Sequence, residues 1–374
     1  MDMDKGLPHL KGTARELIDA LLEKAVSFRA SDVHIEPMDN MVRIRLRIDG
    51  VLMTLGYIQR DKLEAMLVRL KVLASLDIAM KRLPQDGRFF WEDCGRRFDL
   101  RLSTMPTIRG EKAVLRILDA VSASLTLTQL GLTECVIKEI RSVIRLQHGL
   151  FIVSGPTGSG KSTTLYAILH ELDAATVSIA TLEDPVEYKV DGFCQSQVHA
   201  KGGVEFHNGL RALLRQDPDI LVIGEIRDRE TAEIAVRASL TGHLVLTTLH
   251  ASSALDAVTR LLDMGIEAYL VADALSGIAA QRLARRLCPQ CRSGGSRGPG
   301  CAHCHQCGYY GRFCLCEIVP VRYHVRAAVR NGAGKDLLSA AAIKDGALFF
   351  HDAAAAALQK GLTDADEIDR VCTE

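Results

Sequence analysis

The residues best suited to chemistry form one glycine-rich loop, Gly155-Pro156-Thr157-Gly158-Ser159-Gly160-Lys161-Ser162-Thr163. A buried strand is predicted before it, at 150–154, and a helix after it, at 162–172. Glycines let backbone N–H groups surround a phosphate at the positive end of the helix dipole. Lys161 is expected to reach the β- and γ-phosphates, and the Ser162 hydroxyl to bind Mg²⁺. The pattern therefore predicts a nucleoside triphosphate site rather than an ordinary glycine turn.

Two further apolar runs end in acidic residues. Residues 219–223 lead to Gly224-Glu225, and residues 177–182 lead to Glu183-Asp184-Pro185. In a parallel sheet, such strand ends lie beside the phosphate loop. Hydrolysis needs one acid near the metal and another that orients a water, and Glu225 and Glu183 can divide these roles. The structural alternatives are a solvated strand end for Glu225 and simple turn chemistry at Asp184-Pro185.

A fourth apolar run, 243–249, has a histidine at each end, His243 and His250. A sensor of the γ-phosphate must lie within hydrogen-bond distance and change its contact on hydrolysis. His250 or Thr247, at the carboxyl end of the run, is a candidate for that sensor. The alternative is a structural role, which is more common for lone histidines.

The spacing of four cysteines predicts a metal site. Cys288-Pro-Gln-Cys291 and Cys301-Ala-His-Cys304 form two CxxC pairs separated by nine residues. Four thiolates suit tetrahedral Zn²⁺, with sulfur at about 2.3 Å. In a reducing compartment, a structural zinc site is favoured over disulfides or free thiols. The ligand register stays open because other candidates lie close by: His303, His305, Cys307, Cys314 and Cys316.

Composition excludes several classes of protein. Lys+Arg and Asp+Glu both number 46, so net charge does not argue for binding to nucleic acid or an anionic membrane. The first residues, MDMDKGLPHLKG, lack the apolar core of a secretory signal. No run approaches the roughly 18 apolar residues of a membrane span. A cytoplasmic protein is predicted, and peripheral docking on a membrane complex stays compatible with this.

The elements that must position these residues fall into successive regions. After a flexible tail at 1–12, residues 13–118 mix helix and strand, with alternation over 41–48 and a hairpin turn at Asp49-Gly50. Residues 119–133 are predicted as a linker. From 134 to about 286, strands alternate with helices, which is typical of a mostly parallel sheet. A cysteine-rich insertion at 287–317 and helices within 320–374 follow, with a helix cap predicted at Thr363.

Together these segments resemble the secretion and pilus-assembly ATPases, the GspE/PilB class of type II secretion and type IV pilus systems. The resemblance runs from about residue 14 to the end of the chain. It is carried by several segments: Ser31 to Pro37 (SDVHIEP), Pro84 to Arg88, Asp99 to Pro106, Thr181 to Tyr188, Arg215 to Asp228, Thr241 to His250, and Gly300 to Arg312. It implies a RecA-like P-loop ATPase domain at 134–374 with a zinc-knuckle insertion, and a smaller α/β domain at 13–118.

The resemblance also implies a role. It implies a hexameric ring at the cytoplasmic face of the inner membrane that uses ATP, Mg²⁺ and Zn²⁺ to drive a platform protein and so assemble a pilus or pseudopilus. Glu183 is then the general base, and Glu225 binds Mg²⁺ through water. Arg101 and Arg116 match arginines that the N-terminal domain moves onto the phosphates, although by spacing alone they are solvated strand residues. The extra N-terminal recruitment domain of many members is not expected in this sequence, which would then be either a trimmed chain or a short member of the family.

Three other functions compete. The first is a retraction motor of the same superfamily. The cysteine pairs and the SDVHIEP segment argue against it, because retraction motors generally lack that zinc site. A nucleotide-switched scaffold with negligible hydrolysis is opposed by the presence of Lys161, Glu183 and Glu225. Nucleic-acid binding through the zinc segment is favoured by nearby arginines. Aromatic residues for base stacking are few, however, so no nucleic-acid partner is expected.

Overall fold

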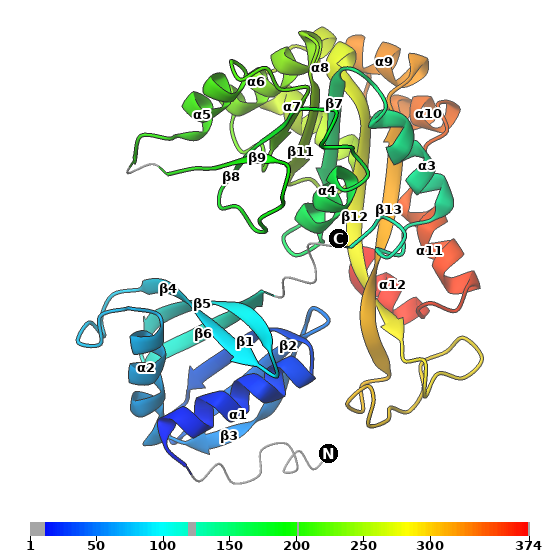
Figure 1. Cartoon of the computed structure of the whole chain (residues 1–374). Helices are drawn as coiled ribbons and strands as arrows, with labels where there is room; N and C mark the ends of the chain where they lie inside the picture. Colours follow the sequence, from blue (N-terminus) through cyan, green and yellow to red (C-terminus); the bar gives the residue numbers. More distant parts are fainter. Residues whose placement is uncertain (1–11, 119–124, 200–201, 373–374) are drawn as a thin grey trace. The chain divides into compact units, whose positions relative to one another are not determined.

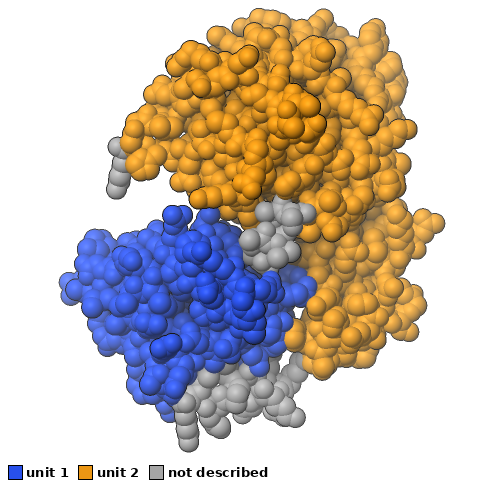
Figure 2. All heavy atoms as spheres, in the orientation of Figure 1, with its two compact units in different colours: residues 1–121 blue, residues 122–374 orange. Residues whose placement is uncertain are grey.

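The computed structural model describes residues 12–118, 125–199 and 202–372. The chain divides into two compact units, residues 1–121 and 122–374 (Figure 1, Figure 2). The expected flexible tail, apart from Gly12, and residues 119–124 of the expected linker lie outside the described residues. The predicted α/β fold class is confirmed, because each unit combines one sheet with helices.

The first unit contains a six-stranded antiparallel sheet in the order β3-β2-β1-β6-β5-β4. One face packs against two helices through a core that includes Leu22, Ile35 and Leu70. The helices are α1 (Ala14–Ser27) and α2 (Lys62–Leu73), and the strands are β1 (Ala30–Pro37), β2 (Met41–Ile48), β3 (Val51–Gln59), β4 (Gln85–Asp93), β5 (Arg96–Thr107) and β6 (Gly110–Leu118).

Local sequence explains several of these elements. Thr13 and Glu16 form a capping box at the start of α1, with the Thr13 N–H donating to Glu16 Oε2 at 2.8 Å. The predicted hairpin turn is confirmed: Asp49 and Gly50 have φ values of 49° and 87° between the paired residues of β2 and β3. Positive φ at both positions is what a two-residue type I′ turn requires.

On the other face of this sheet, charged side chains gather around a buried carboxylate. Buried Glu36 accepts hydrogen bonds from Arg43 at 3.1 Å and from Arg45 at 2.7 and 2.8 Å, and it pairs with Lys112 at 2.9 Å. Burial alone would raise the pKa of Glu36, but the bonds from Arg45 and Lys112 outweigh it and lower the pKa to about 2. A buried carboxylate thus organises the cations of this face.

The second unit contains a seven-stranded sheet in the order β13-β12-β7-β11-β10-β8-β9, parallel except between β12 and β13. The four strands predicted around the phosphate loop are confirmed and form its centre. The bounds are β7 (Gly149–Ser154), β8 (Ile179–Glu183), β9 (Cys194–Gln197), β10 (Ile220–Ile223), β11 (Leu244–Leu249), β12 (Leu275–Leu287) and β13 (Tyr309–Pro320).

Helices cover both faces of this sheet, which explains why its strands are continuous apolar runs. In β7, Leu150 and Ile152 belong to one core, whereas Phe151 and Val153 belong to the other. The helices are α3 (Glu134–Val143), α4 (Lys161–Leu169), α5 (Phe206–Leu213), α6 (Arg229–Leu240), α7 (Ala254–Asp263), α8 (Ala268–Ala274), α9 (Tyr323–Arg330), α10 (Lys335–Lys344), α11 (Phe350–Gln359) and α12 (Ala365–Cys372).

Two local predictions need correction. The helix after the phosphate loop ends at Leu169, three residues before the predicted 172. The cap of α12 is Asp364 rather than Thr363, because Asp364 accepts the N–H of Glu367 at 3.0 Å while Thr363 is buried. Among the described residues, we find no helix with the length and apolar character needed to cross a bilayer.

Candidate active site

The candidate active site lies at the carboxyl edge of the central parallel strands. β7, β11, β10 and β8 are neighbours in that order, so the residues that follow them meet at one edge. The phosphate loop follows β7, His250 follows β11, Glu225 follows β10, and Glu183 ends β8. The fold therefore brings together the residues that the sequence analysis selected from four separate segments.

The phosphate loop has a conformation that requires glycine. Gly155, Gly158 and Gly160 have φ values of 146°, 79° and 87°. A Cβ on Gly155 would lie 2.5 Å from both Gln281 O and Ser159 Oγ. The buried side chain of Gln281, on β12, also donates to Ser159 O at 2.7 Å. Sequence reasoning missed Gln281, which stands between the apolar residues 278–280 and Arg282 and belongs to no motif.

Lys161 begins α4 and contacts the loop that is predicted to hold phosphates. Its Nζ donates to Gly155 O at 2.8 Å and to Pro156 O at 3.0 Å. Burial lowers the pKa of Lys161, and the nearby Glu225 carboxylate opposes that shift. Ser162 and Thr163 follow in the first turn of the same helix, where backbone N–H groups are available to an anion.

Glu225 is the centre of a polar cluster. His250 Nε2 lies 3.1 Å from its Oε1, and Arg227 Nε donates to its Oε2 at 3.0 Å. Burial lowers the pKa of His250, as does Lys161, while the Glu225 carboxylate opposes them. Arg227 also contacts Asp184 at 3.4 Å. Sequence reasoning gave Arg227 no role, although it lies within the segment quoted for the resemblance.

The structure separates the two sensor candidates. Thr247 is fully buried in β11, and its hydroxyl bonds to the carbonyl of Thr248 at 3.4 Å. The His250 side chain is 47% exposed at the carboxyl edge and contacts Glu225. Of the two, His250 is the more accessible, and its role as a sensor stays a prediction.

Glu183 is buried and held by neutral donors. The Tyr166 hydroxyl donates to Glu183 Oε2 at 2.6 Å, and the Thr181 hydroxyl donates to Oε1 at 2.8 Å. Gln195 Nε2 lies 3.4 Å from the same Oε1. The adjacent Asp184 is exposed and bonds instead to Arg227. Tyr166 was missed because an aromatic residue on an apolar helix looks the same in sequence whether it fills a core or holds a carboxylate.

Arg101 and Arg116 lie in the first unit, directly opposite each other across β5 and β6. Arg116 Nε donates to Asp32 Oδ1 at 3.0 Å, and Asp32 is buried while the Arg116 side chain is 61% exposed. The remaining predicted site residues belong to the second unit. The movement of these two arginines onto a nucleotide stays a prediction.

Four cysteines at the tip of the β12–β13 hairpin form a candidate metal site. The Sγ atoms of Cys288, Cys291, Cys301 and Cys304 all lie within 4.8 Å of one another. Three of the sulfur pairs are separated by 3.7, 3.8 and 3.7 Å. A tetrahedron with Zn–S bonds of about 2.3 Å has edges of about 3.8 Å, so the spacing fits Zn²⁺.

Backbone N–H groups support one of these four sulfur atoms as a thiolate. The backbone N–H groups of Cys301 and Gly308 each lie 3.2 Å from Cys304 Sγ. Burial by itself would raise the pKa of Cys304, but these N–H bonds, together with the thiols of Cys301 and Cys291, lower it, whereas burial and bonds with the neighbouring thiols raise the pKa of Cys291. A thiolate supported in this way is a good metal ligand.

The other candidate ligands have different surroundings. The Cys307 thiol donates to Cys304 O at 2.8 Å, and Cys314 and Cys316 are buried in β13 within the sheet core. The His303 ring stacks on Tyr310 with centroids 3.9 Å apart. Among the described residues, the group of side chains placed to hold a metal ion is therefore formed by the first two CxxC pairs.

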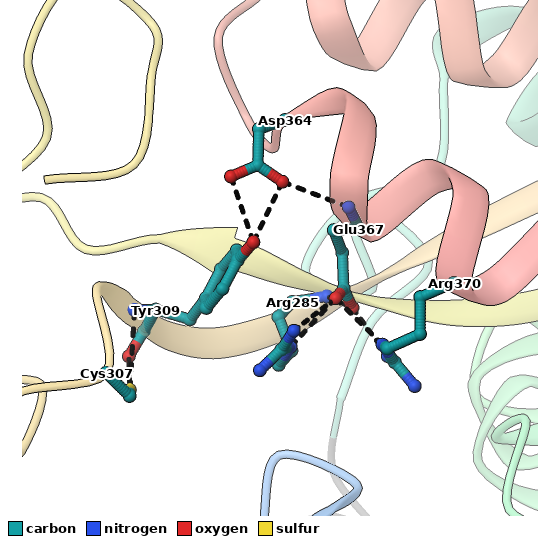
Figure 3. Close-up of polar contacts among 6 residues, drawn as sticks. All are labelled: Arg285, Cys307, Tyr309, Asp364, Glu367 and Arg370. Carbon is teal, nitrogen blue, oxygen red and sulfur yellow. Dashed lines mark hydrogen bonds and ion pairs between the residues drawn. The ribbon is translucent and has the colours of Figure 1, made fainter.

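The strand ends that border the cysteine loop are tied to α12 and its cap residue (Figure 3). Tyr309 donates to Asp364 at 2.8 Å, and Arg285 donates to the fully buried Glu367 at 2.6 Å. Arg370 Nε also donates to Glu367 at 2.8 Å. The guanidinium of Arg285 lies 3.9 Å above the Tyr309 ring. The C-terminal helix is thereby fixed to the strands that carry the cysteines.

Comparison with known proteins gives a consistent result. A family model described as "Type II/IV secretion system protein" matches residues 10–370. The type II secretion system protein HxcR of Pseudomonas aeruginosa is 46% identical over 374 residues, which cover 99% of this chain and 79% of that protein.

Solved structures agree with the fold. The X-ray structure of the Legionella pneumophila ATPase DotB is similar with a TM-score of 0.76 at 21% identity, covering 98% of this chain and 97% of DotB. The pilus retraction motor PilT with bound ADP is similar with a TM-score of 0.63 at 25% identity, covering 94% of this chain and 96% of PilT.

Proposed function

Because the chain belongs to the type II/IV secretion system protein family and is an ATPase of that family, we propose that it is a hexameric motor that assembles a pilus or pseudopilus. The observation that carries this proposal is the meeting of the phosphate loop, Glu183, Glu225 and His250 at one sheet edge. The site then acts in the cytoplasm at the inner face of the inner membrane, on a membrane platform protein.

In the proposed reaction, the oxygen of a water forms a bond to the γ-phosphorus of ATP. The bond from that phosphorus to the bridging oxygen breaks, and ADP leaves with the electron pair. Glu183 takes the proton that the water releases and later returns it to solvent. Lys161 and the backbone N–H groups of residues 157–163 hold the phosphates, and His250 senses the γ-phosphate through its contact with Glu225.

Two metal ions belong to the proposal. The hydroxyl of Ser162 and, through water, the carboxylate of Glu225 offer the oxygen donors that Mg²⁺ prefers, and the ion would neutralise charge on the β- and γ-phosphates. Cys288, Cys291, Cys301 and Cys304 would hold a structural Zn²⁺. Arg101 and Arg116 would supply further positive charge to the phosphates and couple hydrolysis to movement of the first unit.

The test is the Mg²⁺-dependent ATPase rate per protomer over a wide range of protein concentration. We expect this rate to rise with concentration, because a ring completes each site only on assembly. Glu183→Gln should abolish hydrolysis while nucleotide binding is retained, since an amide cannot accept the proton of the water. Lys161→Ala is the control without a functional phosphate loop.

The opposite results have clear meanings. A Glu183→Gln variant that keeps half of its turnover would remove Glu183 as the base. A rate that stays negligible at every concentration, and after addition of cytoplasmic domains of a platform protein, would favour the nucleotide-switched scaffold. A constant, substantial rate per protomer would contradict completion of the site by assembly.

A further inference from the structure

We propose that Tyr166 is a positioning residue for hydrolysis: it holds the carboxylate of Glu183 in the orientation that a general base needs. This inference rests on the proposed role of Glu183. It concerns a residue that neither the sequence patterns nor the family resemblance singled out. It follows from contacts within the second unit alone.

The contact itself is short and sheltered. The Tyr166 hydroxyl donates to Glu183 Oε2 at 2.6 Å, and the Tyr166 residue is only 2% exposed. Hydrogen bonds to a charged acceptor at such distances are stronger than those between neutral groups. Burial, together with the bond to Glu183, raises the pKa of Tyr166, so it remains a phenol and a donor at every working pH. Tyr166 therefore keeps the proton that it donates to Glu183.

The phenol is itself fixed in place. Its ring packs edge-on against Tyr188, with centroids 5.5 Å apart and ring planes at 84°. Gln195 Nε2 lies 3.3 Å from the Tyr166 oxygen and donates to the carbonyl of Tyr188 at 2.9 Å. Because both the ring and the hydroxyl are held, the direction of the bond to Glu183 is set by the fold rather than by side-chain flexibility.

The geometry leaves capacity for a water. A carboxylate oxygen has two lone pairs, and Tyr166 uses one of those on Oε2. Thr181 and Gln195 act on the other oxygen, Oε1. The carboxylate is thus oriented from three elements, α4, β8 and β9, by donors that carry no charge. A fixed, unneutralised carboxylate with a lone pair to spare suits proton abstraction.

The position of Tyr166 also connects the base to the phosphates. Lys161 begins α4 and Tyr166 lies on the same helix. The element whose amino end is predicted to hold the phosphates therefore also carries the donor that orients the base. A shift of α4 on nucleotide binding or release would be transmitted directly to Glu183.

The experiment compares Tyr166→Phe with the matched control Tyr269→Phe. Each variant loses a phenol hydroxyl that bonds to a glutamate of the second unit, but Tyr269 is 51% exposed on α8 and bonds to Glu267, whereas Tyr166 bonds to Glu183. We expect kcat of Tyr166→Phe to fall roughly 10- to 100-fold, the range for loss of a hydrogen bond to a charged group. KM for ATP and the Kd for a non-hydrolysable analogue should be unchanged, and Tyr269→Phe should remain near wild type.

A second variant separates positioning from packing. Tyr166→Met lacks the hydroxyl but packs differently, so its Tm should differ from that of Tyr166→Phe while its loss of kcat should be similar. A loss of kcat that follows Tm across the variants would overturn the proposal, as would a Tyr166→Phe rate equal to or above wild type. Glu183→Gln distinguishes failure of this proposal from failure of the proposed function. If Glu183→Gln retains turnover, Glu183 is not the base. If Glu183→Gln is inactive while Tyr166→Phe is fully active, only the role of Tyr166 is contradicted.

Discussion

Two buried glutamates, Glu36 and Glu183, have opposite surroundings. Glu36 is bound by Arg43, Arg45 and Lys112, so its charge is neutralised. Glu183 is bound by the neutral groups of Tyr166, Thr181 and Gln195, so its charge is oriented but not neutralised. The first arrangement suits a structural ion network, and the second suits a base. The type of partner, rather than burial alone, distinguishes the two roles.

The Glu36 network leads to a prediction about stability and pH. The bonds from Arg45 and Lys112 lower its pKa from 4.5 to about 2. A lowered carboxyl pKa stabilises the fold above the unfolded value, and the stabilisation is lost as pH falls toward the folded value. We expect Glu36→Gln to lower the free energy of unfolding by about 2 kcal/mol near neutral pH, after allowance for solvent screening. The difference from wild type should shrink as pH falls from 4.5 toward about 2.

Trp91 makes this prediction measurable. It is the single tryptophan of the chain and lies on β4, so its fluorescence reports urea unfolding of the first unit. Glu23→Gln, an exposed change on α1, is the control for loss of a carboxylate elsewhere in that unit. A Glu36→Gln variant as stable as wild type at neutral pH would show that the network does not stabilise the unit.

At the scale of elements, the β12–β13 hairpin carries the cysteines in the loop at its tip, and the strand ends that border this loop hold α12. The residues that hold the helix are close to the cysteines along the chain: Arg285 lies three positions before Cys288, and Tyr309 directly follows Cys307 and Gly308. Tyr309 and Arg285 then bond to Asp364 and Glu367 of the helix region (Figure 3). The conformation of the cysteine loop is thereby coupled to the position of α12.

This connection predicts the effect of losing the metal. Cys288→Ser should lose Zn²⁺, because three thiolates and a hydroxyl bind it much more weakly. Residues 288–316 and α12 should then exchange amide hydrogens faster, while ATP binding is retained. Zinc content by mass spectrometry and hydrogen exchange of residues 365–372 are the measurements.

Cys307→Ser is the matched control, because the Cys307 thiol donates to Cys304 O and lies outside the four-sulfur cluster. It should keep its zinc. Zinc retained in Cys288→Ser and lost from Cys307→Ser would contradict the ligand set. Absence of zinc from the purified wild-type protein would contradict the metal assignment altogether.

At the scale of the whole molecule, the proposed ring makes the sites of different copies depend on one another. We expect mixtures of wild-type protein with Lys161→Ala to hydrolyse ATP more slowly than the wild-type fraction alone predicts. The reason is that an inactive copy in a ring would block movements that its neighbours require. ATPase rate against mixing fraction at constant total protein is the measurement.

The control for this experiment is an equal addition of a protein unable to join the ring, such as serum albumin, which should leave the wild-type rate unchanged. A strictly linear decrease with the fraction of Lys161→Ala would show that the copies work independently. In that case the assembly-motor proposal would need another source of coordination.

The sequence by itself determined the parts of the site that depend on local chemistry. The phosphate loop needs glycines at fixed spacing, and continuous apolar runs ending in Glu183, Glu225 and His250 require a parallel sheet whose strand ends coincide. The hairpin turn at Asp49-Gly50 likewise depends on two adjacent residues that tolerate positive φ. Such features follow from backbone conformation and residue type within a few positions, so they are readable without a fold.

Only the tertiary structure decided which side chains meet across long separations. It selected four sulfur atoms from seven neighbouring cysteines, because Cys307 bonds to a carbonyl and Cys314 and Cys316 face the core. It also placed Tyr166 against Glu183, Arg227 between Glu225 and Asp184, and Gln281 against Ser159. These contacts depend on how helices and strands pack, and packing is set by the whole core rather than by any local pattern.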